Sequence, residues 1–196
     1  MLNKSPNQNQ IKDLISLYNK KSFHQVIFKI SDLLNLFPNS YLLFNIQGAS
    51  YAGLKDFNSA IISYKKAINL NPSFADAHNN LGIIYKTKGD IKSAIRYFNK
   101  ALKIKPKYAE ALNNLGVAYK ELGDFELALK NYNEALVIKP NYPEAINNIG
   151  NLLRDKGLFH EAIEKYNQTI FINPNFTDAN FIDAYKNKCE VLEKLN

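Results

Sequence analysis

The sequence has one cysteine, one methionine and no tryptophan among its 196 residues. The single cysteine, Cys189, cannot form a disulfide within the chain, which agrees with a reducing compartment. No stretch approaches the run of about eighteen apolar residues that a membrane-spanning helix needs. The first ten residues also lack the apolar core of a secretory signal. We therefore expect a cytoplasmic protein with no membrane partner.

Acidic residues are fewer than basic ones, and the formal net charge is +7 at pH 7. A basic surface can bind nucleic acid because it releases counterions from the phosphates. Here, however, lysines are spread through every segment of the sequence and form no local cluster. We therefore expect no specific nucleic-acid partner.

The most regular feature of the sequence is a repeat of 34 residues. Proline recurs at positions 38, 72, 106, 140 and 174, glycine at 48, 82, 116 and 150, and a second glycine at 89, 123 and 157. Lys21 and Lys55 stand in place of this second glycine in the earlier copies. With the first glycine row numbered as position 8, the copies begin at Asn7, Tyr41, Ala75, Ala109 and Pro143. A period of this length is typical of stacked helical hairpins.

Further rows complete the pattern. Position 11 holds Tyr51, Tyr85, Tyr119 and Leu153, position 20 holds Ala60, Ala94, Ala128 and Ala162, and position 24 holds Tyr64, Phe98, Tyr132 and Tyr166. The sequence therefore resembles the tetratricopeptide repeat family over nearly its whole length. The resemblance implies an all-α fold: an α-solenoid in which five helical hairpins form a right-handed superhelix, followed by a C-terminal capping helix.

Each row has a physical reason. Positions 4, 7, 8 and 11 share one face of the first helix, so they predict a stripe packed against the second helix. Gly82 and Ala94 are small because two helix backbones approach each other there. The glycine at position 15 predicts that the first helix ends in the left-handed conformation, and Asp90 or Asp124 beside it can cap the second helix.

The repeat predicts a single domain with seven segments. These are a disordered tail over residues 1–6, a degenerate first repeat over 7–40, repeats over 41–74, 75–108, 109–142 and 143–176, and the capping helix over 177–196. The register slips by five residues after Pro174. Matching Phe181 to Phe74 places Asn187 at position 6, Cys189 at position 8 and Leu192 at position 11.

Positions 2, 6, 9 and 13 of each first helix lie opposite the packed stripe, so we expect them to line a concave groove. Asparagines stand at positions 5 and 6, acidic residues at position 2, and basic residues at position 12 on the flank of the groove. The candidate binding residues are Asn45, Asn79, Asn80, Asn113, Asn114, Asn147, Asn148, Asp76, Glu110, Glu144, Lys86, Lys120 and Arg154.

The chemistry of asparagine suits a polypeptide ligand. A carboxamide offers an acceptor and two donors, so a row of them can hold the backbone of an extended peptide without reading its side chains. The alternative is inheritance: about one residue in seven is asparagine, and copied repeats share residues without selection. The acidic row also complements the helix dipole, and the basic row can simply be solvated.

Two narrower family resemblances bear on the ligand. Residues 74–82 and 108–116 resemble repeats of O-linked N-acetylglucosamine transferases, which implies that Asn80, Asn114 and Asn148 contact substrate backbones. The two-carboxylate clamp of other tetratricopeptide proteins needs lysine at position 5 and asparagine at position 9, whereas this sequence has Asn79 and Ile83 there. We therefore expect no binding to chaperone tails.

Catalysis is not expected. All glycines but one fall on the repeat rows, so no phosphate-binding loop remains, and the three histidines form no pattern of metal ligands. We expect no enzyme, no cofactor and no metal. The favoured interpretation is a scaffold that binds a protein or an extended peptide segment. The alternatives are a recruiting or assembly domain of a larger enzyme, such as a glycosyltransferase, and weak self-association through the repeat ends.

Overall fold

The computed structural model describes residues 5–172 and 179–195, and the described residues form eleven α-helices and no β-strand. The helices are α1 (Gln8–Asn19), α2 (Phe23–Leu36), α3 (Tyr41–Gly53), α4 (Phe57–Leu70), α5 (Ala75–Thr87), α6 (Ile91–Ile104), α7 (Ala109–Glu121), α8 (Phe125–Ile138), α9 (Pro143–Asp155), α10 (Phe159–Ile172) and α11 (Ala179–Leu195). The expected all-α solenoid fold class is confirmed. Most of the expected N-terminal tail and the link between α10 and α11 lie outside the described residues.

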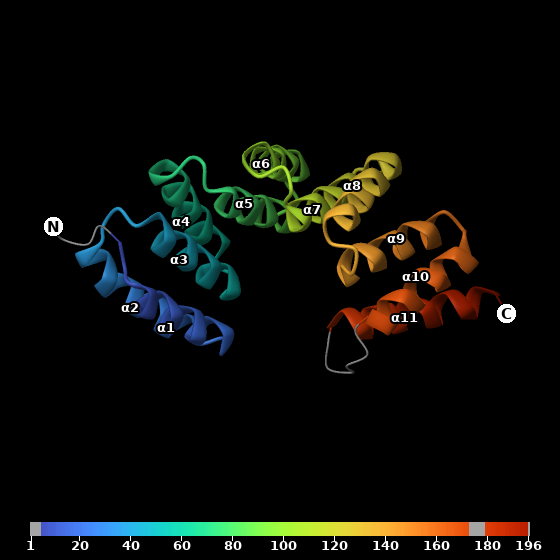
Figure 1. The fold of residues 1–196 in the computed structure, drawn as a ribbon, viewed down its shortest axis with the longest axis horizontal. Coiled ribbons are helices and arrows are strands. Elements are labelled where there is room, and N and C mark those ends of the chain that lie inside the picture. The colour runs from blue at the N-terminus through green and yellow to red at the C-terminus, as the bar shows by residue number, and fades with distance from the viewer. Residues whose placement is uncertain (1–4, 173–178, 196) are drawn as a thin grey trace. The chain divides into compact units, whose positions relative to one another are not determined.

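The chain divides into two compact units, residues 1–105 and residues 106–196, called unit 1 and unit 2 below. In unit 1, α1 pairs with α2, α3 with α4, and α5 with α6, and each hairpin also packs on the next through α2 with α3 and α4 with α5. Figure 1 shows these six helices in blue to green. Unit 1 is thus three consecutive hairpins in contact.

Unit 2 repeats this arrangement with two hairpins and a single helix. Helix α7 pairs with α8 and α9 with α10, while α8 packs on α9. The last helix, α11, packs on both α10 and α9 (Figure 1). It therefore takes the place that the first helix of a further hairpin would have.

Aspartates cap the N-termini of three of the second helices. The side chains of Asp56, Asp90 and Asp124 accept hydrogen bonds from backbone N–H groups three residues on, at 3.0–3.1 Å. A capping carboxylate satisfies one of the N–H groups that have no partner inside the helix. The hydrogen bonds from Ser93 hold the pKa of Asp90 below its usual value. The expected capping role of Asp90 and Asp124 is confirmed.

The chain turns from first to second helix through a residue in the left-handed region. The φ angle is +81° at Gly89 and +81° at Gly123, and the lysines that replace this glycine adopt it too, with 57° at Lys21 and 62° at Lys55. Left-handed backbone disfavours residues with a Cβ atom. The predicted helix end at position 15 is therefore confirmed, and the two lysines adopt it at a cost.

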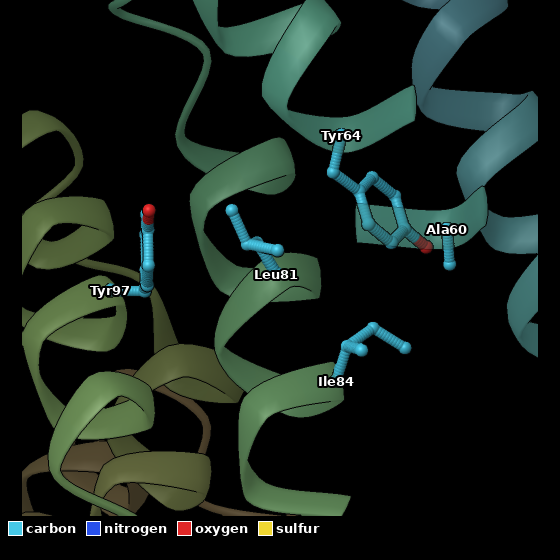
Figure 2. Close-up of a cluster of buried hydrophobic side chains, with 5 residues drawn as sticks. All are labelled: Ala60, Tyr64, Leu81, Ile84 and Tyr97. Atoms are coloured by element: carbon cyan, nitrogen blue, oxygen red, sulfur yellow. The ribbon is translucent and has the colours of Figure 1, made fainter. Parts of the chain in front are cut away.

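In the second to fifth hairpins a ring of the second helix packs over a glycine of the first helix, whereas the first hairpin has Leu14 and Ile30 at these positions. A Cβ atom on Gly82 would lie 2.6 Å from the Phe98 ring, which is fully buried. Between hairpins, Ala60 and Tyr64 of α4 pack with Leu81 and Ile84 of α5 (Figure 2). The contact within the hairpin uses position 8 of the predicted stripe. The contact between hairpins uses Leu81 at position 7 and Ile84 at position 10.

Candidate functional site

A pocket of about 470 Å³ opens in unit 1 on the first helices of its three hairpins. Most of its lining atoms are apolar, and no charged residue lines it. The lining residues are Ile15, Tyr18, Asn45, Ile46, Ala49, Ala52, Gly53, Tyr64, Asn80, Ile83 and Ile84. Concave, mostly apolar sites with a few placed polar groups are the usual form of a ligand site.

The repeat explains why these residues meet. Ile15, Ala49 and Ile83 all stand at position 9, one of the positions expected to line the groove, and they come from α1, α3 and α5. Gly53 leaves room for the ring of Phe23, because a Cβ atom at Gly53 would lie 2.5 Å from that ring. Sequence reasoning placed position 9 in the groove but selected only polar residues as candidates, and the apolar row was the signal that it passed over.

Two asparagines on the pocket wall are hydrogen-bonded to each other. The Nδ2 of Asn80 donates to the Oδ1 of Asn45 at 3.2 Å, and the Nδ2 of Asn79 makes a long contact of 3.5 Å to the Oδ1 of Asn80. Because a carboxamide has two N–H donors, one donor of Asn80 is not used in the bond to Asn45. Both Asn45 and Asn80 are half-buried and line the pocket.

Unit 2 contains the same asparagine pair. The Nδ2 of Asn148 donates to the Oδ1 of Asn113 at 2.9 Å, so position 6 of one hairpin again bonds to position 5 of the hairpin before it. Asn114, at position 6 of the first hairpin in this unit, is half-buried. The asparagine rows therefore link adjacent first helices, which sequence reasoning did not foresee.

Burial separates the two asparagine rows. Asn79, Asn113 and Asn147 at position 5 are only 4%, 6% and 8% exposed, whereas Asn80, Asn114 and Asn148 at position 6 are half-buried. Asn45, also at position 5, is the exception, because it is half-buried like the position 6 row and lines the pocket.

The basic row of unit 2 is occupied by ion pairs. The Nζ of Lys120 lies 2.8 Å from Asp155, and Arg154 lies 3.3 Å from Asp155 and 3.1 Å from Glu190. Burial raises the pKa of Asp155, but the hydrogen bonds and charges of Lys120 and Arg154 outweigh it and lower the pKa. These two cations are therefore already neutralised within unit 2. Lys86, their counterpart in unit 1, is half-buried.

The acidic row begins the first helices, as expected. Asp76, Glu110 and Glu144 each lie in the first turn of α5, α7 and α9. Burial raises the pKa of Tyr142, and the charges of Glu144 and Glu110 raise it further. The two glutamates thus act on a common neighbour within unit 2.

No group of histidine, cysteine and acidic residues suited to hold a metal occurs among the residues that the structure describes. His78 fills position 4 and is 5% exposed, and its Nε2 donates to the carbonyl of Pro72 at 3.0 Å. His78 is therefore a packing residue.

Within the same described part, no helix is both long and apolar enough to cross a membrane.

Family models match the central part of the chain. A tetratricopeptide repeat model matches residues 75–108 and 109–142, and a second model for this repeat matches residues 48–89. The chain carries tetratricopeptide repeats. No curated protein matches its sequence.

Several solved structures match most of the chain, and one of them is described as a tetratricopeptide-repeat protein. The thermophilic protein TTC0263 of Thermus thermophilus is 19% identical with a TM-score of 0.79, and the match covers 95% of this chain and 98% of that one. MamA is 26% identical with a TM-score of 0.68, covering 81% of this chain and 93% of that one. The APC/C hetero-tetramer Cut9–Hcn1 contains a chain that is 22% identical with a TM-score of 0.82, covering 93% of this chain and 36% of that one.

Proposed function

We propose that this tetratricopeptide-repeat chain is a non-catalytic scaffold that binds an extended segment of another polypeptide on the first helices of its repeats. The observation that carries the proposal is the pocket of unit 1, where apolar walls meet the paired carboxamides of Asn45 and Asn80. The remaining N–H of Asn80 would donate to a backbone carbonyl of the ligand, while a large apolar side chain of the ligand fills the pocket.

The charge of unit 1 favours an acidic ligand. Residues 1–105 contain 15 lysine and arginine residues against 5 aspartates, whereas residues 106–196 contain 10 basic against 13 acidic residues. A positive unit attracts acidic segments and speeds their association. Since the pocket itself has no charged lining residue, the anchor that enters it should be uncharged. We therefore propose an acidic segment with a leucine or an aromatic residue at its centre.

In unit 2 the proposal assigns the same role to Asn114 and Asn148. The resemblance to the repeats of O-linked N-acetylglucosamine transferases supports this role, because it implies backbone contacts at position 6. The buried asparagines of position 5 would hold the position 6 row in place, as Asn113 does for Asn148.

Binding to short fluorescein-labelled peptides tests the proposal. The peptides carry phenylalanine, leucine or alanine at the centre, with either acidic or basic flanks, and binding is followed by fluorescence anisotropy. We expect the acidic phenylalanine or leucine peptides to bind most tightly. If no peptide of any composition binds, or if the basic peptides bind best, the proposal is wrong. Single-stranded oligonucleotide is added as a competitor, and displacement of the peptide by it would indicate a nucleic-acid ligand instead.

Paired variants locate the site. Asn80→Ala should weaken peptide binding by roughly 3- to 10-fold, the worth of one hydrogen bond. The matched control is Asn99→Ala on the exposed face of α6. Equal loss in both variants, with helicity unchanged, would contradict a backbone-binding role for Asn80.

A second pair tests the pocket. Ile15→Glu places a charge in the apolar lining at a residue that is 46% exposed, so the fold should tolerate it. Binding should fall by about tenfold or more, because an apolar side chain contributes about 1.5 kcal/mol or more when buried. Ile62→Glu makes the same change of charge on α4, outside the pocket, at a residue that is 68% exposed, and should have a smaller effect.

A further inference from the structure

Helix α11 exposes four residues at the spacing of a coiled-coil seam. Ile182, Tyr185, Cys189 and Leu192 follow one another at intervals of three, four and three residues. Ile182 and Tyr185 are each 52% exposed, Leu192 is 42% exposed, and Cys189 is also exposed. This is the a and d pattern by which two helices pack against each other. We call these four residues the α11 seam.

The other side of α11 is held firmly by unit 2. Ala184 and Val191 are fully buried in a core with Ala162 and Tyr166. Together with the ion pair between Arg154 and Glu190, this packing fixes α11 on unit 2 with Ile182, Cys189 and Leu192 exposed. The helix needs no further ordering to bind a partner, which lowers the entropic cost of association.

The register of α11 explains why the seam is apolar. The Nδ2 of Asn187 contacts the Oδ1 of Asn147 at 3.5 Å, as the Nδ2 of Asn148 contacts that of Asn113. Asn187 therefore takes position 6. Tyr185, Cys189 and Leu192 then take positions 4, 8 and 11, which face the second helix in every earlier hairpin.

A second helix that carries a ring at position 24 does not fit this face closely. In the second to fifth hairpins position 8 is glycine, and a Cβ atom on Gly82 would lie 2.6 Å from the ring of Phe98. The first hairpin has Leu14 at position 8, and Ile30 replaces the ring there. Cys189 also has a Cβ atom, so the seam favours a partner that packs at the wider spacing of a coiled coil over one that repeats the contact of a ring with glycine.

We propose that the α11 seam pairs with the α11 seam of a second copy of this chain in a parallel, two-stranded coiled coil. The flanking charges decide both partner and direction. Lys188 and Glu193 stand at the g and e positions five residues apart, so a parallel pair brings Lys188 of each copy beside Glu193 of the other. An antiparallel pair would bring Lys186 against Lys186 and Lys188 against Lys188, which repel.

Sedimentation velocity over a range of protein concentrations, with reductant present, tests the pairing. We expect a dimer that dissociates on dilution. Leu192→Glu should make the chain monomeric, whereas Phe171→Glu, at a residue of α10 that is 86% exposed and outside the seam, should leave the dimer unchanged. A wild-type chain that stays monomeric at all concentrations, or a dimer that survives Leu192→Glu, overturns the proposal.

The single cysteine reports the direction of the pair. In a parallel pair, Cys189 of one copy faces Cys189 of the other across an a layer, so a short bifunctional maleimide should link the two copies. In an antiparallel pair it faces Tyr185, and linkage should fail. Lys188→Glu and Glu193→Lys should each weaken the dimer, and the double variant should restore it. A double variant no better than the single ones overturns the parallel register.

Discussion

At the scale of single residues, position 24 of the repeat holds buried rings with different surroundings. The hydroxyl of Tyr166 donates to Asn151 at 3.0 Å, whereas that of Tyr132 has no hydrogen-bond partner among the described residues, and the same position in unit 1 already holds Phe98. A buried polar group without a partner costs about 1–3 kcal/mol. The two tyrosines therefore allow a buried hydroxyl with a hydrogen-bond partner to be compared with one that has none.

We expect Tyr132→Phe to raise the free energy of unfolding by about 1 kcal/mol and Tyr166→Phe to lower it by a similar amount. Urea denaturation followed by circular dichroism gives both values. Both rings keep their volume in the change to phenylalanine, so packing cancels in the comparison. Equal effects of the two substitutions would show that the Tyr132 hydroxyl does find a partner.

His78 should make stability depend on pH. Burial lowers its pKa below the usual 6.5, the hydrogen bond to Pro72 opposes this, and Lys100 adds to the lowering. Because the pKa of His78 is lower in the folded state than in the unfolded state, protonation of His78 favours unfolding. The folded state has its full stability above the unfolded-state pKa and loses part of it as the pH falls through the folded-state pKa. His78→Leu, which copies Leu112 at position 4, should therefore stabilise the chain more at about pH 5 than at about pH 7.5. Thermal denaturation checks this, with the exposed His160→Leu as control.

The sequence predicts where the asparagines stand but not what they contact. A carboxamide bonds equally well to a ligand or to a neighbouring carboxamide, and the choice depends on the distance between adjacent first helices. Only the structure gives the 3.2 Å contact of Asn80 with Asn45 and the burial of Asn113. For the same reason, the pairing of Lys120 with Asp155 lay beyond the sequence, since 35 positions separate the two residues.

At the scale of helices, the turn between first and second helix accounts for much of the regularity. Gly89 and Lys55 occupy the same turn with φ of +81° and 62°, and a Cβ atom on Gly89 would meet no atom within 4 Å. Any cost at this position is therefore backbone strain without a clash. The helix bounds could be predicted from the sequence because each end depends on residues close in the chain, such as the cap Asp90.

We expect Lys55→Gly to raise the free energy of unfolding by about 1 kcal/mol and Gly89→Lys to lower it by a similar amount, the cost of left-handed backbone for a residue with a side chain. Chemical denaturation measures both. Gly82→Ala is the contrasting variant, since its Cβ atom would press on the buried Phe98 ring. It should cost more than Gly89→Lys, by about 1–3 kcal/mol of overpacking. The reverse order would contradict the assignment of strain to one glycine and close contact to the other.

At the scale of the whole chain, the uneven charge was hidden in the sequence. Lysines do occur in every segment, but the acidic residues gather after residue 105, so unit 1 carries a surplus of 10 positive charges from 15 basic and 5 acidic residues. The net charge of +7 is a sum over the whole sequence, so it describes neither unit until the boundary between them is known. A repeat with constant packing residues thus leaves the surface free to differ from one unit to the other.

Because unit 1 is positively charged, salt should weaken the attraction of the acidic flanks of the ligand but not the apolar contact of its anchor. Raising the ionic strength from about 0.1 M to about 1 M shortens the Debye length from about 10 Å to about 3 Å and should weaken binding of an acidic peptide to the wild-type chain. The contribution of the apolar anchor should remain, so the ratio of affinities between phenylalanine and alanine peptides should hardly change with salt. Fluorescence anisotropy titrations measure both. An affinity that does not depend on salt would contradict the proposed role of the acidic flanks. A ratio of phenylalanine to alanine affinities that falls to about one at high salt would contradict binding of the anchor in the pocket of Ile15, Ala49 and Ile83.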